Sequence, residues 1–251
     1  MARKALGPAT LAVVQAVDAL PPQPWTVACS GGADSLALAW AASHVAARRG
    51  TPVAALVVDH GLQPGSDVVA ADVVARLASF GLDAVAVRVS VAAGRNLEAA
   101  AREARYAALD AQAGTGAAIL LGHTRDDQAE TVLLGLARGS GPRSLAGMPA
   151  RRGRLVRPLL GLPRRLTSQA CAELGLSPWQ DPMNEDPHYA RVRVRGRVLP
   201  LLERELGPGI AEALARTAGL CRDAADALDA AAAPLAGEPE PDAEALAAAP
   251  A

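Results

Sequence analysis

The residues best suited to chemistry form a short loop, Ser30-Gly31-Gly32-Ala33-Asp34-Ser35, between an apolar run and a helical pattern. Glycines let the backbone approach a phosphate closely, and the loop amides, the start of the helix and the two serine hydroxyls can donate hydrogen bonds to it. Asp34 is then available to hold Mg²⁺, which prefers carboxylate and phosphate oxygens. No Gly-Lys-Ser/Thr sequence occurs, which excludes the common nucleotide-hydrolase loop. The structural alternative is a tight turn in which a serine caps the helix.

A second constellation is acidic: Gly122-His123-Thr124-Arg125-Asp126-Asp127-Gln128-Ala129-Glu130-Thr131. Glu130 follows Asp126 by four positions and Asp127 by three, so the three carboxylates share one helix face. Like charges this close repel each other, and a cation relieves the repulsion. That cation could be Mg²⁺ or a substrate ammonium group. The alternative is a solvated helix start, where acidic residues are common in any case.

Basic residues are concentrated in three places. In the stretch from Asn96 to Tyr106, Glu98 and Arg102 are expected to pair along a helix, whereas Arg105 has no acidic residue four positions away and is available to phosphate. Eight arginines and no acidic residue lie from Arg138 to Arg165, and a second cluster comprises Arg191, Arg193, Arg195 and Arg197. These clusters predict a nucleic-acid surface, with a solvated basic face as the alternative.

The elements that must position these residues alternate regularly along the first part of the chain. We expect four buried strands at Trp25 to Cys29, Val53 to Val58, Ala84 to Val89 and Ala117 to Leu121. Helices are expected at Asp34 to Arg49, Ser66 to Phe80, Asn96 to Ala113 and Arg125 to Arg138. This alternation predicts an α/β fold with a parallel sheet covered by helices on both faces. Such sheets bind ligands at the carboxyl ends of their strands, where the strand order reverses.

The rest of the chain is less regular. An amphipathic first helix ends before Pro21, and later helices are expected at Pro163 to Leu174, His188 to Leu206 and Gly209 to Ala233. Residues 234–251, rich in Ala, Pro and Glu, predict a disordered tail.

Composition bounds the class of protein. At 251 residues, with 51% hydrophobic and 20% charged residues, the chain is typical of globular proteins. Three cysteines without a Cys-x-x-Cys pair indicate a reducing compartment, the cytoplasm. Gln15 and Asp18 interrupt the N-terminal apolar run, which disfavours export, and no stretch approaches the about 20 apolar residues of a membrane span.

Taken together, these motifs resemble the PP-loop ATP pyrophosphatases and, among them, the tRNA(Ile)-lysidine synthetases. Further matching pieces are Asp59-His60-Gly61-Leu62, Arg138-Gly139-Ser140-Gly141, Gly147-Met148, Arg157-Pro158-Leu159-Leu160, Asp181-Pro182-Met183-Asn184-Glu185-Asp186 with Tyr189, Arg191 and Arg195, and Leu199-Pro200. The match covers about Val27 to Leu202. Met183, Val192 and Gln63 depart from the pattern, where serine, asparagine and arginine are common.

The resemblance implies an adenine nucleotide alpha hydrolase-like fold over residues 1–206, with a tRNA-contacting segment, then a helical appendage at 207–233. It implies a ligase that joins L-lysine to the wobble cytidine of tRNA(Ile) with a CAU anticodon through an adenylated intermediate, releasing AMP and pyrophosphate and changing the codon read from AUG to AUA. The cofactors would be ATP and Mg²⁺.

The resemblance also implies roles for residues. Asp34 would bind Mg²⁺ and count among the catalytic residues, as would Arg105, with contacts near ATP and the cytidine. Three further catalytic carboxylates would position the lysine amine and help to remove its proton: Asp126, Asp127 and Glu130. ATP would contact the loop from Ser30 to Ser35 together with His60, Gly122 and His123. Contacts with the tRNA would come from Arg105, Arg138, Asn184, Arg191 and Arg195.

Three rival functions remain open from the sequence. A tRNA thiolation enzyme typically needs paired cysteines, and this sequence has no Cys-x-x-Cys pair. An amide-forming synthetase usually carries an ammonia-supplying part, for which 251 residues leave little room. An RNA-binding module that senses a nucleotide without turnover would not need all four acidic residues, Asp34, Asp126, Asp127 and Glu130. The sequence leaves the oligomeric state undecided, with a homodimer as one alternative.

Overall fold

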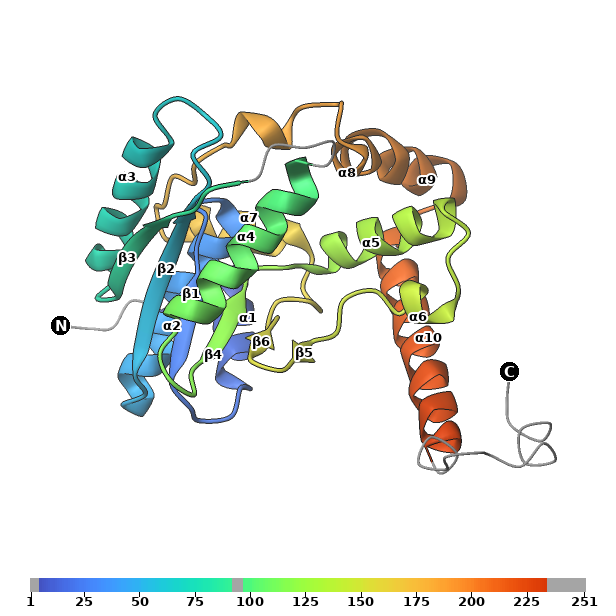
Figure 1. The fold of residues 1–251 in the computed structure, drawn as a ribbon, viewed down its shortest axis with the longest axis horizontal. Coiled ribbons are helices and arrows are strands. Elements are labelled where there is room, and N and C mark those ends of the chain that lie inside the picture. Colours follow the sequence, from blue (N-terminus) through green and yellow to red (C-terminus); the bar gives the residue numbers. More distant parts are fainter. Residues whose placement is uncertain (1–4, 92–96, 234–251) are drawn as a thin grey trace. The chain divides into compact units, whose positions relative to one another are not determined.

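The computed structural model describes residues 5–91 and 97–233, which form two compact units (Figure 1). Unit 1 comprises Met1–Arg125 and Ala150–Glu185, and unit 2 comprises Asp126–Pro149 and Asp186–Ala251. Residues 1–206, expected as one catalytic domain, therefore include parts of both units. The predicted tail at 234–251 lies outside the described residues.

Unit 1 is built on a six-stranded sheet with the order β3-β2-β1-β4-β6-β5. The strands are β1 (Trp25–Ala28), β2 (Val53–Asp59), β3 (Asp83–Arg88), β4 (Ala118–Leu121), β5 (Arg151–Arg152) and β6 (Leu155–Val156). All neighbours pair in parallel except β5 with β6, and in the centre Trp25 of β1 is in register with Val53 on one side and Ala118 on the other. The chain runs outward from β1 to β3 and then returns to β4 on the other side of β1. The loops that follow β1 and β4 therefore meet at the position where the strand order reverses.

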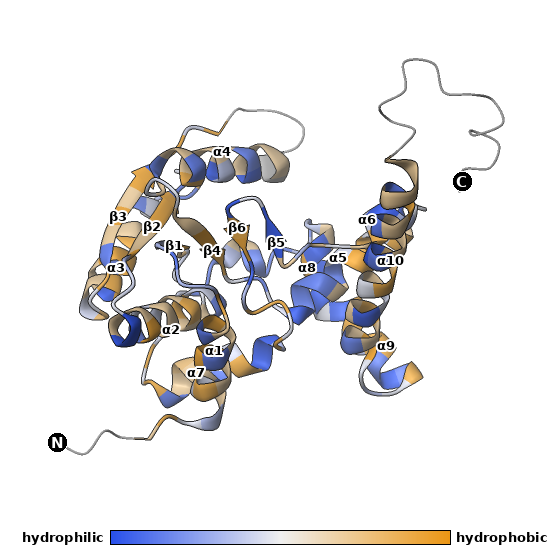
Figure 2. Ribbon diagram, turned by 90° about the horizontal axis from the view of Figure 1, so that it is seen from below, coloured by the Kyte–Doolittle hydropathy of each residue, from blue (hydrophilic) through white to orange (hydrophobic). Residues whose placement is uncertain are grey.

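Helices cover both faces of this sheet, as predicted (Figure 2). The helices α1 (Pro8–Asp18), α2 (Ala33–Arg49), α3 (Ser66–Ser79) and α7 (Arg164–Glu173) share the larger core with Val27 and Leu120. On the opposite face, Leu109 of α4 (Leu97–Gln112) packs with Leu56, Ile119 and Leu121. Because adjacent residues of a strand point to opposite faces, Leu120 and Ile119 enter different cores.

The burial predicted for strand β3 is wrong. Its residues are mostly exposed, and Val85 is 52% accessible. As the edge strand it pairs with β2 alone, so its apolar residues reflect β propensity rather than burial on both faces. The hairpin of β5 and β6 was not predicted, since strands of two residues leave no periodic signal.

The second unit is helical in its described part. It contains most of α5 (Arg125–Ala137), then α6 (Pro142–Leu145), α8 (Ala190–Arg193), a π-helical turn η2 (Val194–Val198), α9 (Leu199–Leu206) and α10 (Ile210–Ala232). The helix predicted from His188 to Leu206 thus runs from Ala190 and contains a π turn. Pro200 explains that irregularity, because it has no N–H for the carbonyl of Gly196. Among the described helices, none is both long and apolar enough to cross a membrane.

Candidate functional site

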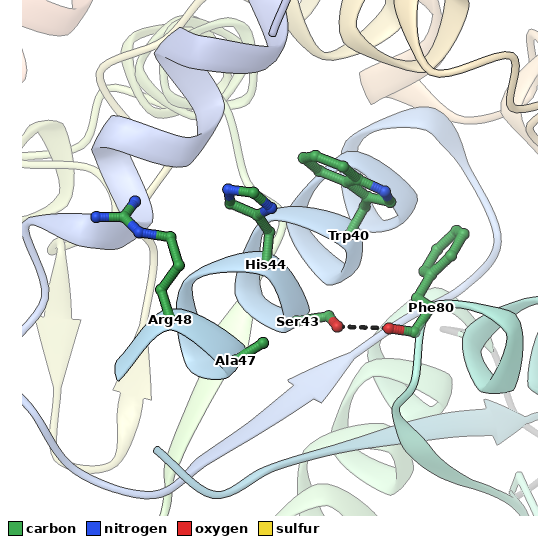
Figure 3. Close-up of a pocket in the computed structure, with 6 residues that line it drawn as sticks. All are labelled: Trp40, Ser43, His44, Ala47, Arg48 and Phe80. Carbon is green, nitrogen blue, oxygen red and sulfur yellow. Dashed lines mark hydrogen bonds between the residues drawn. The ribbon is translucent and has the colours of Figure 1, made fainter. Parts of the chain in front are cut away.

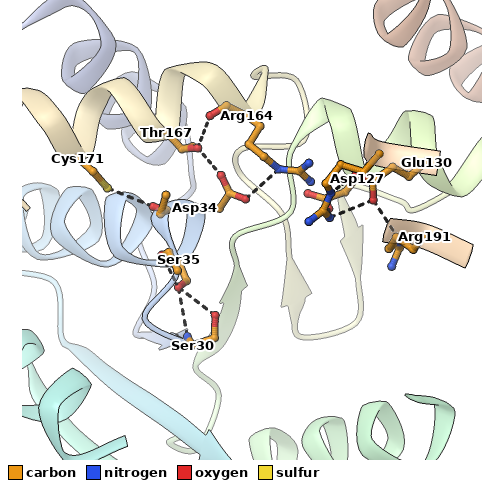
Figure 4. Close-up of polar contacts among 12 residues, drawn as sticks. Ser30, Asp34, Ser35, Asp127, Glu130, Arg164, Thr167, Cys171 and Arg191 are labelled. Carbon is orange, nitrogen blue, oxygen red and sulfur yellow. Dashed lines mark hydrogen bonds and ion pairs between the residues drawn. The ribbon is translucent and has the colours of Figure 1, made fainter. Parts of the chain in front are cut away.

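The predicted phosphate loop is held by hydrogen bonds that converge on Ser35 (Figure 4). The Ser30 amide donates to Ser35 Oγ at 3.2 Å, and Ser35 Oγ donates to the Gly32 carbonyl at 3.0 Å. The two serine hydroxyl oxygens lie 3.3 Å apart. Ser35 is buried, whereas Ser30 is exposed, so Ser35 is the shielded centre of these contacts. The loop conformation is therefore organised by its own side chains.

The start of α2 has the features of an anion site. Gly32, rather than a serine, is the N-cap residue, and no side chain caps the helix there. The first N–H groups of a helix have no acceptor within the helix, and they carry the positive end of its dipole. An anion such as a phosphate can satisfy these donors.

Two glycines are required by close approaches around the loop. Gly31 has a φ of +84°, and a Cβ atom added to it would lie 2.6 Å from Val73 Cγ2. A Cβ atom on Gly122, directly after β4, would lie 3.1 Å from backbone atoms of Asp34. The chain after β4 thus packs against the first turn of α2, which brings the two predicted nucleotide-contacting segments together within unit 1.

Asp34, the expected magnesium ligand, faces a basic residue in this structure. Arg164 Nε lies 3.4 Å from its Oδ2 atom, and the Thr167 hydroxyl donates to Oδ1. In the described part of the chain, no group of three or more His, Cys, Asp or Glu residues could hold a metal ion. A single carboxylate next to an anion-binding helix start fits Mg²⁺, which is often bound by one or two carboxylates and completed by phosphate oxygens and water.

The turn after β2 places His60 near Arg105 of α4. Burial lowers the pKa of His60, and the positive charge of Arg105 lowers it further, so the ring is neutral at pH 7. Preceding it, Asp59 accepts a hydrogen bond from the Gly61 amide at 2.8 Å and pairs with Arg88 at 3.4 Å. Burial opposes the ionised form of Asp59, but these contacts outweigh it and lower its pKa. Both predicted residues, His60 and Arg105, therefore lie in one charged neighbourhood.

A segment that sequence reasoning did not connect to the loop lies against it. The Trp179 amide donates to the Gly31 carbonyl at 2.9 Å. Asp181 caps the short helix η1 (Pro182–Asn184), and its Oδ1 atom accepts hydrogen bonds from the amide of Met183 and from Gln63 Nε2 at 2.8 Å. Gln63, a departure from the family pattern, thus anchors this segment. Asp before Pro is a helix-start signal that indicates the cap, but the long-range partner has no local signal.

In unit 2, the predicted carboxylates Asp127 and Glu130 are paired with predicted RNA-contacting arginines (Figure 4). Glu130 is fully buried, and Arg195 donates to its two oxygens at 2.8 and 3.2 Å. Arg191 Nε forms an ion pair with Glu130 Oε2 at 3.2 Å without hydrogen-bond geometry, and Arg191 Nη2 donates to Thr131 Oγ1 at 2.7 Å. Asp127 Oδ1 lies 3.6 Å from Arg195. Guanidinium groups thus lie where the sequence indicated a need for cations.

The candidate residues are divided between the two units. Unit 1 holds Ser30 to Ser35, His60, Arg105, Gly122, His123 and Asn184, and unit 2 holds Asp126, Asp127, Glu130, Arg138, Arg191 and Arg195. Asn184 and Arg138 are exposed, and Asp126 is half-buried. The predicted pair of Glu98 and Arg102 involves a side chain outside those described.

A pocket of about 520 Å³ lies elsewhere in unit 1 and is lined by Trp40, Ser43, His44, Ala47, Arg48 and Phe80 (Figure 3). It is lined by α2 from Trp40 onward and by Phe80 at the end of α3, away from the phosphate loop at the start of α2. The Trp40 and His44 rings stack within it at 5.1 Å. We assign no role in the chemistry to this pocket, because it contains none of the candidate residues.

Comparison with known proteins places the chain in a family. Residues 9–202 match the PP-loop domain family. The chain is 60% identical over 206 residues to a tRNA(Ile)-lysidine synthase of Leifsonia xyli and 59% identical over 207 residues to one of Thermobifida fusca. These matches cover 81% of this chain but only 62% and 64% of the two relatives, so the chain spans less than two thirds of their length. A relative from Salinispora arenicola is 57% identical, with coverage of 87% of this chain and 68% of its own.

Among solved structures, the U34-tRNA thiolase NcsA of Methanococcus maripaludis, determined with its 4Fe-4S cluster, has a TM-score of 0.66. The match covers 85% of this chain and 80% of that one at 16% identity. At that identity the likeness shows a common fold.

Proposed function

Because the chain belongs to the tRNA(Ile)-lysidine synthase family of PP-loop proteins, we propose that it ligates L-lysine to the wobble cytidine of tRNA(Ile). The substrate is the isoleucine tRNA with a CAU anticodon, and the product reads AUA instead of AUG. ATP is consumed, and AMP and pyrophosphate are released. The reaction takes place in the cytoplasm.

The observation that carries this proposal is the uncapped start of α2 next to the loop organised by Ser35. Donors that are already oriented toward an anion need no rearrangement when charge develops on the departing pyrophosphate. Asp34 would hold Mg²⁺ at this position, and the ion would neutralise the negative charge that builds up on the phosphate oxygens.

The first step activates the cytidine. A carbonyl oxygen of the base attacks the α-phosphorus of ATP, the new oxygen–phosphorus bond forms, and the bond to the pyrophosphate oxygen breaks. In unit 1, the loop from Ser30 to Ser35 orients the phosphates, and Arg105 contributes positive charge. Gly122 and His123 complete the nucleotide contacts after β4. Single-stranded anticodon loops suit this chemistry because their bases can leave the stack.

The second step forms the carbon–nitrogen bond. The lysine side-chain amine attacks the activated ring carbon, and AMP leaves with the oxygen. A free lysine amine has a pKa of about 10.4, so a carboxylate must position it and accept a proton. The candidates are Asp126, Asp127 and Glu130, of which Asp126 is the half-buried one and Glu130 is already paired with arginines. Arg138, Asn184, Arg191 and Arg195 are assigned to the tRNA.

The thiolation alternative has less support from the cysteines. Burial raises the pKa of Cys171 to about 11, with a further increase from the charge of Asp34. Burial likewise raises the pKa of Cys29. Thiolates are the reactive form in sulfur transfer, and these two thiols stay protonated at neutral pH.

The test is incorporation of radiolabelled lysine into an unmodified tRNA(Ile) transcript with a CAU anticodon. Wild-type protein with ATP and Mg²⁺ should transfer label, and Asp34→Asn should abolish the transfer. Asp67→Asn is the matched control, since Asp67 is an exposed acid in the first turn of α3 and should leave the transfer unchanged. Pyrophosphate release that depends on another amine or RNA, without lysine transfer, would overturn the assignment. Sedimentation of the same protein decides between monomer and homodimer.

A further inference from the structure

Arg157, to which no role has been assigned above, is buried in unit 1. Arg157 follows β6, is 5% exposed, and its amide donates to the Ala150 carbonyl at 2.8 Å. A buried charge is costly unless partners compensate it. The partners of this side chain therefore indicate why an arginine occupies the position.

One partner is His123, in the segment after β4. Arg157 Nε lies 3.2 Å from His123 Nδ1 and donates a hydrogen bond to it. Arginine has no acceptor and does not lose its proton, so Nδ1 of the histidine must be the acceptor. A neutral imidazole carries one proton, which then resides on Nε2. The hydrogen bond from Arg157 thus favours the Nε2–H tautomer of His123.

The hydroxyl of Tyr106 in α4 also forms a hydrogen bond with the Arg157 side chain. The guanidinium carbons of Arg102 and Arg105 lie 5.3 and 5.4 Å from the centre of the Tyr106 ring. Three guanidinium groups from two segments therefore gather around one phenol. Such a concentration of positive charge attracts an anion.

The position of His123 connects this cluster with the phosphate loop. His123 directly follows Gly122, which packs against the backbone of Asp34 at the first turn of α2. A donor at His123 therefore belongs to the same edge of the sheet as the anion site at the start of that helix.

We propose that Arg157 is a positioning residue that holds His123 as the Nε2–H tautomer, so that His123 donates a hydrogen bond to a phosphate of bound ATP. The identity of the nucleotide rests on the proposed function, whereas the tautomer does not. In the opposite tautomer, Nε2 would be an acceptor and would repel a phosphate oxygen. Arg157 acts on the nucleotide through His123 and not by direct contact.

The tautomer can be measured on the wild-type protein by two-bond ¹⁵N–¹H correlation spectra of the imidazole rings. The chain has four histidines, and the signal that disappears in His123→Gln identifies the ring of interest. We expect the pattern of an Nε2–H ring for His123. An Nδ1–H pattern in the wild type would overturn the proposal, and this observation depends on no variant at position 157.

The effect on ATP is tested with Arg157→Met, which keeps the length of the side chain and removes its donors. We expect His123 to populate both tautomers and the Kd for ATP, measured by calorimetry without tRNA or lysine, to rise about 10-fold. Arg48→Met, at the opposite end of α2, removes an equal charge and should leave the Kd unchanged. If Arg157→Met is folded and its tautomer and Kd equal the wild-type values, Arg157 has only a packing role.

Tyr106→Phe provides a second, milder variant in case Arg157→Met does not fold. It removes the Tyr106 hydroxyl as a partner of Arg157 and should raise the Kd for ATP by about 3-fold, with exchange between the tautomers of His123. Wild-type values of both quantities would contradict the proposal. A protein that binds ATP with the expected tautomer but transfers no lysine would instead leave this inference intact and overturn the proposed function.

Discussion

Replacing Glu130 with glutamine should destabilise unit 2 by about 3 kcal/mol. The Glu130 side chain has no exposed surface, and it faces Arg195 at 2.8 Å and Arg191 at 3.2 Å. Breaking a buried ion pair by removal of one partner typically costs about 3–5 kcal/mol, because the remaining charge stays uncompensated. The two arginine side chains are 33% and 25% exposed, so water can recover part of the loss. This places the expected cost at the lower end of the range.

The assay is urea unfolding followed by far-UV circular dichroism. All three tryptophans, Trp25, Trp40 and Trp179, lie in unit 1, so tryptophan fluorescence does not report directly on unit 2. Glu212→Gln is the matched control, because its pair with Arg216 is 52% and 65% exposed and is expected to contribute below about 1 kcal/mol. If Glu130→Gln loses no more stability than this control, the carboxylate is not a structural partner of the arginines and the reasoning fails.

Three further variants test the framework of unit 1. Gly31→Ala should destabilise it by at least about 1 kcal/mol in urea unfolding followed by tryptophan fluorescence, because a side chain is disfavoured at positive φ and would collide with Val73; an unchanged midpoint would contradict the glycine requirement. Arg154→Ala should cost about 2 kcal/mol in the same assay, since its guanidinium donates to the carbonyls of Ala113 and Gly114, just after α4, and of Ala117, just before β4. A loss under about 0.5 kcal/mol, the size expected for an ordinary surface site, would show that these hydrogen bonds do not stabilise the loop. Glu173 has its pKa lowered by hydrogen bonds from the Thr10 hydroxyl and amide, so its contribution is present above the unfolded pKa and is lost as the pH falls through the folded pKa. The stability difference between wild type and Glu173→Gln should therefore shrink below about pH 4.5, and a difference independent of pH would refute the linkage.

The central strands could be predicted from sequence because each is a short apolar run next to a proline, a glycine or a polar loop. The predicted bounds of β1, β2 and β4 differ from the structure by one residue at one end each. Burial of β3 was predicted wrongly, since the same apolar pattern fits an edge strand. The hairpin of β5 and β6 depends on pairing with β4 and on the contacts of Arg154 with Ala117, and neither has a local signal.

The phosphate loop was visible in the sequence because its requirements are local: glycine where a side chain would collide, and serines within five residues that bond to one another. The charge state of the site is set over longer separations. Arg164 is 130 residues from Asp34, and Asp181 is 118 residues from Gln63. Sequence spacing on one helix can show that carboxylates lie close together, but it cannot show which cation, distant in sequence, compensates their charge.

The acidic helix start of unit 2 illustrates the consequence for experiment. Repulsion between Asp127 and Glu130 predicted a cation, and guanidinium groups of Arg191 and Arg195, more than 60 residues away, lie beside them. Residues assigned separately to amine activation and to tRNA contact are therefore one electrostatic group. A variant of either arginine also removes one of the charged partners of the buried Glu130 carboxylate. A loss of activity therefore identifies an RNA contact only if unit 2 keeps its stability.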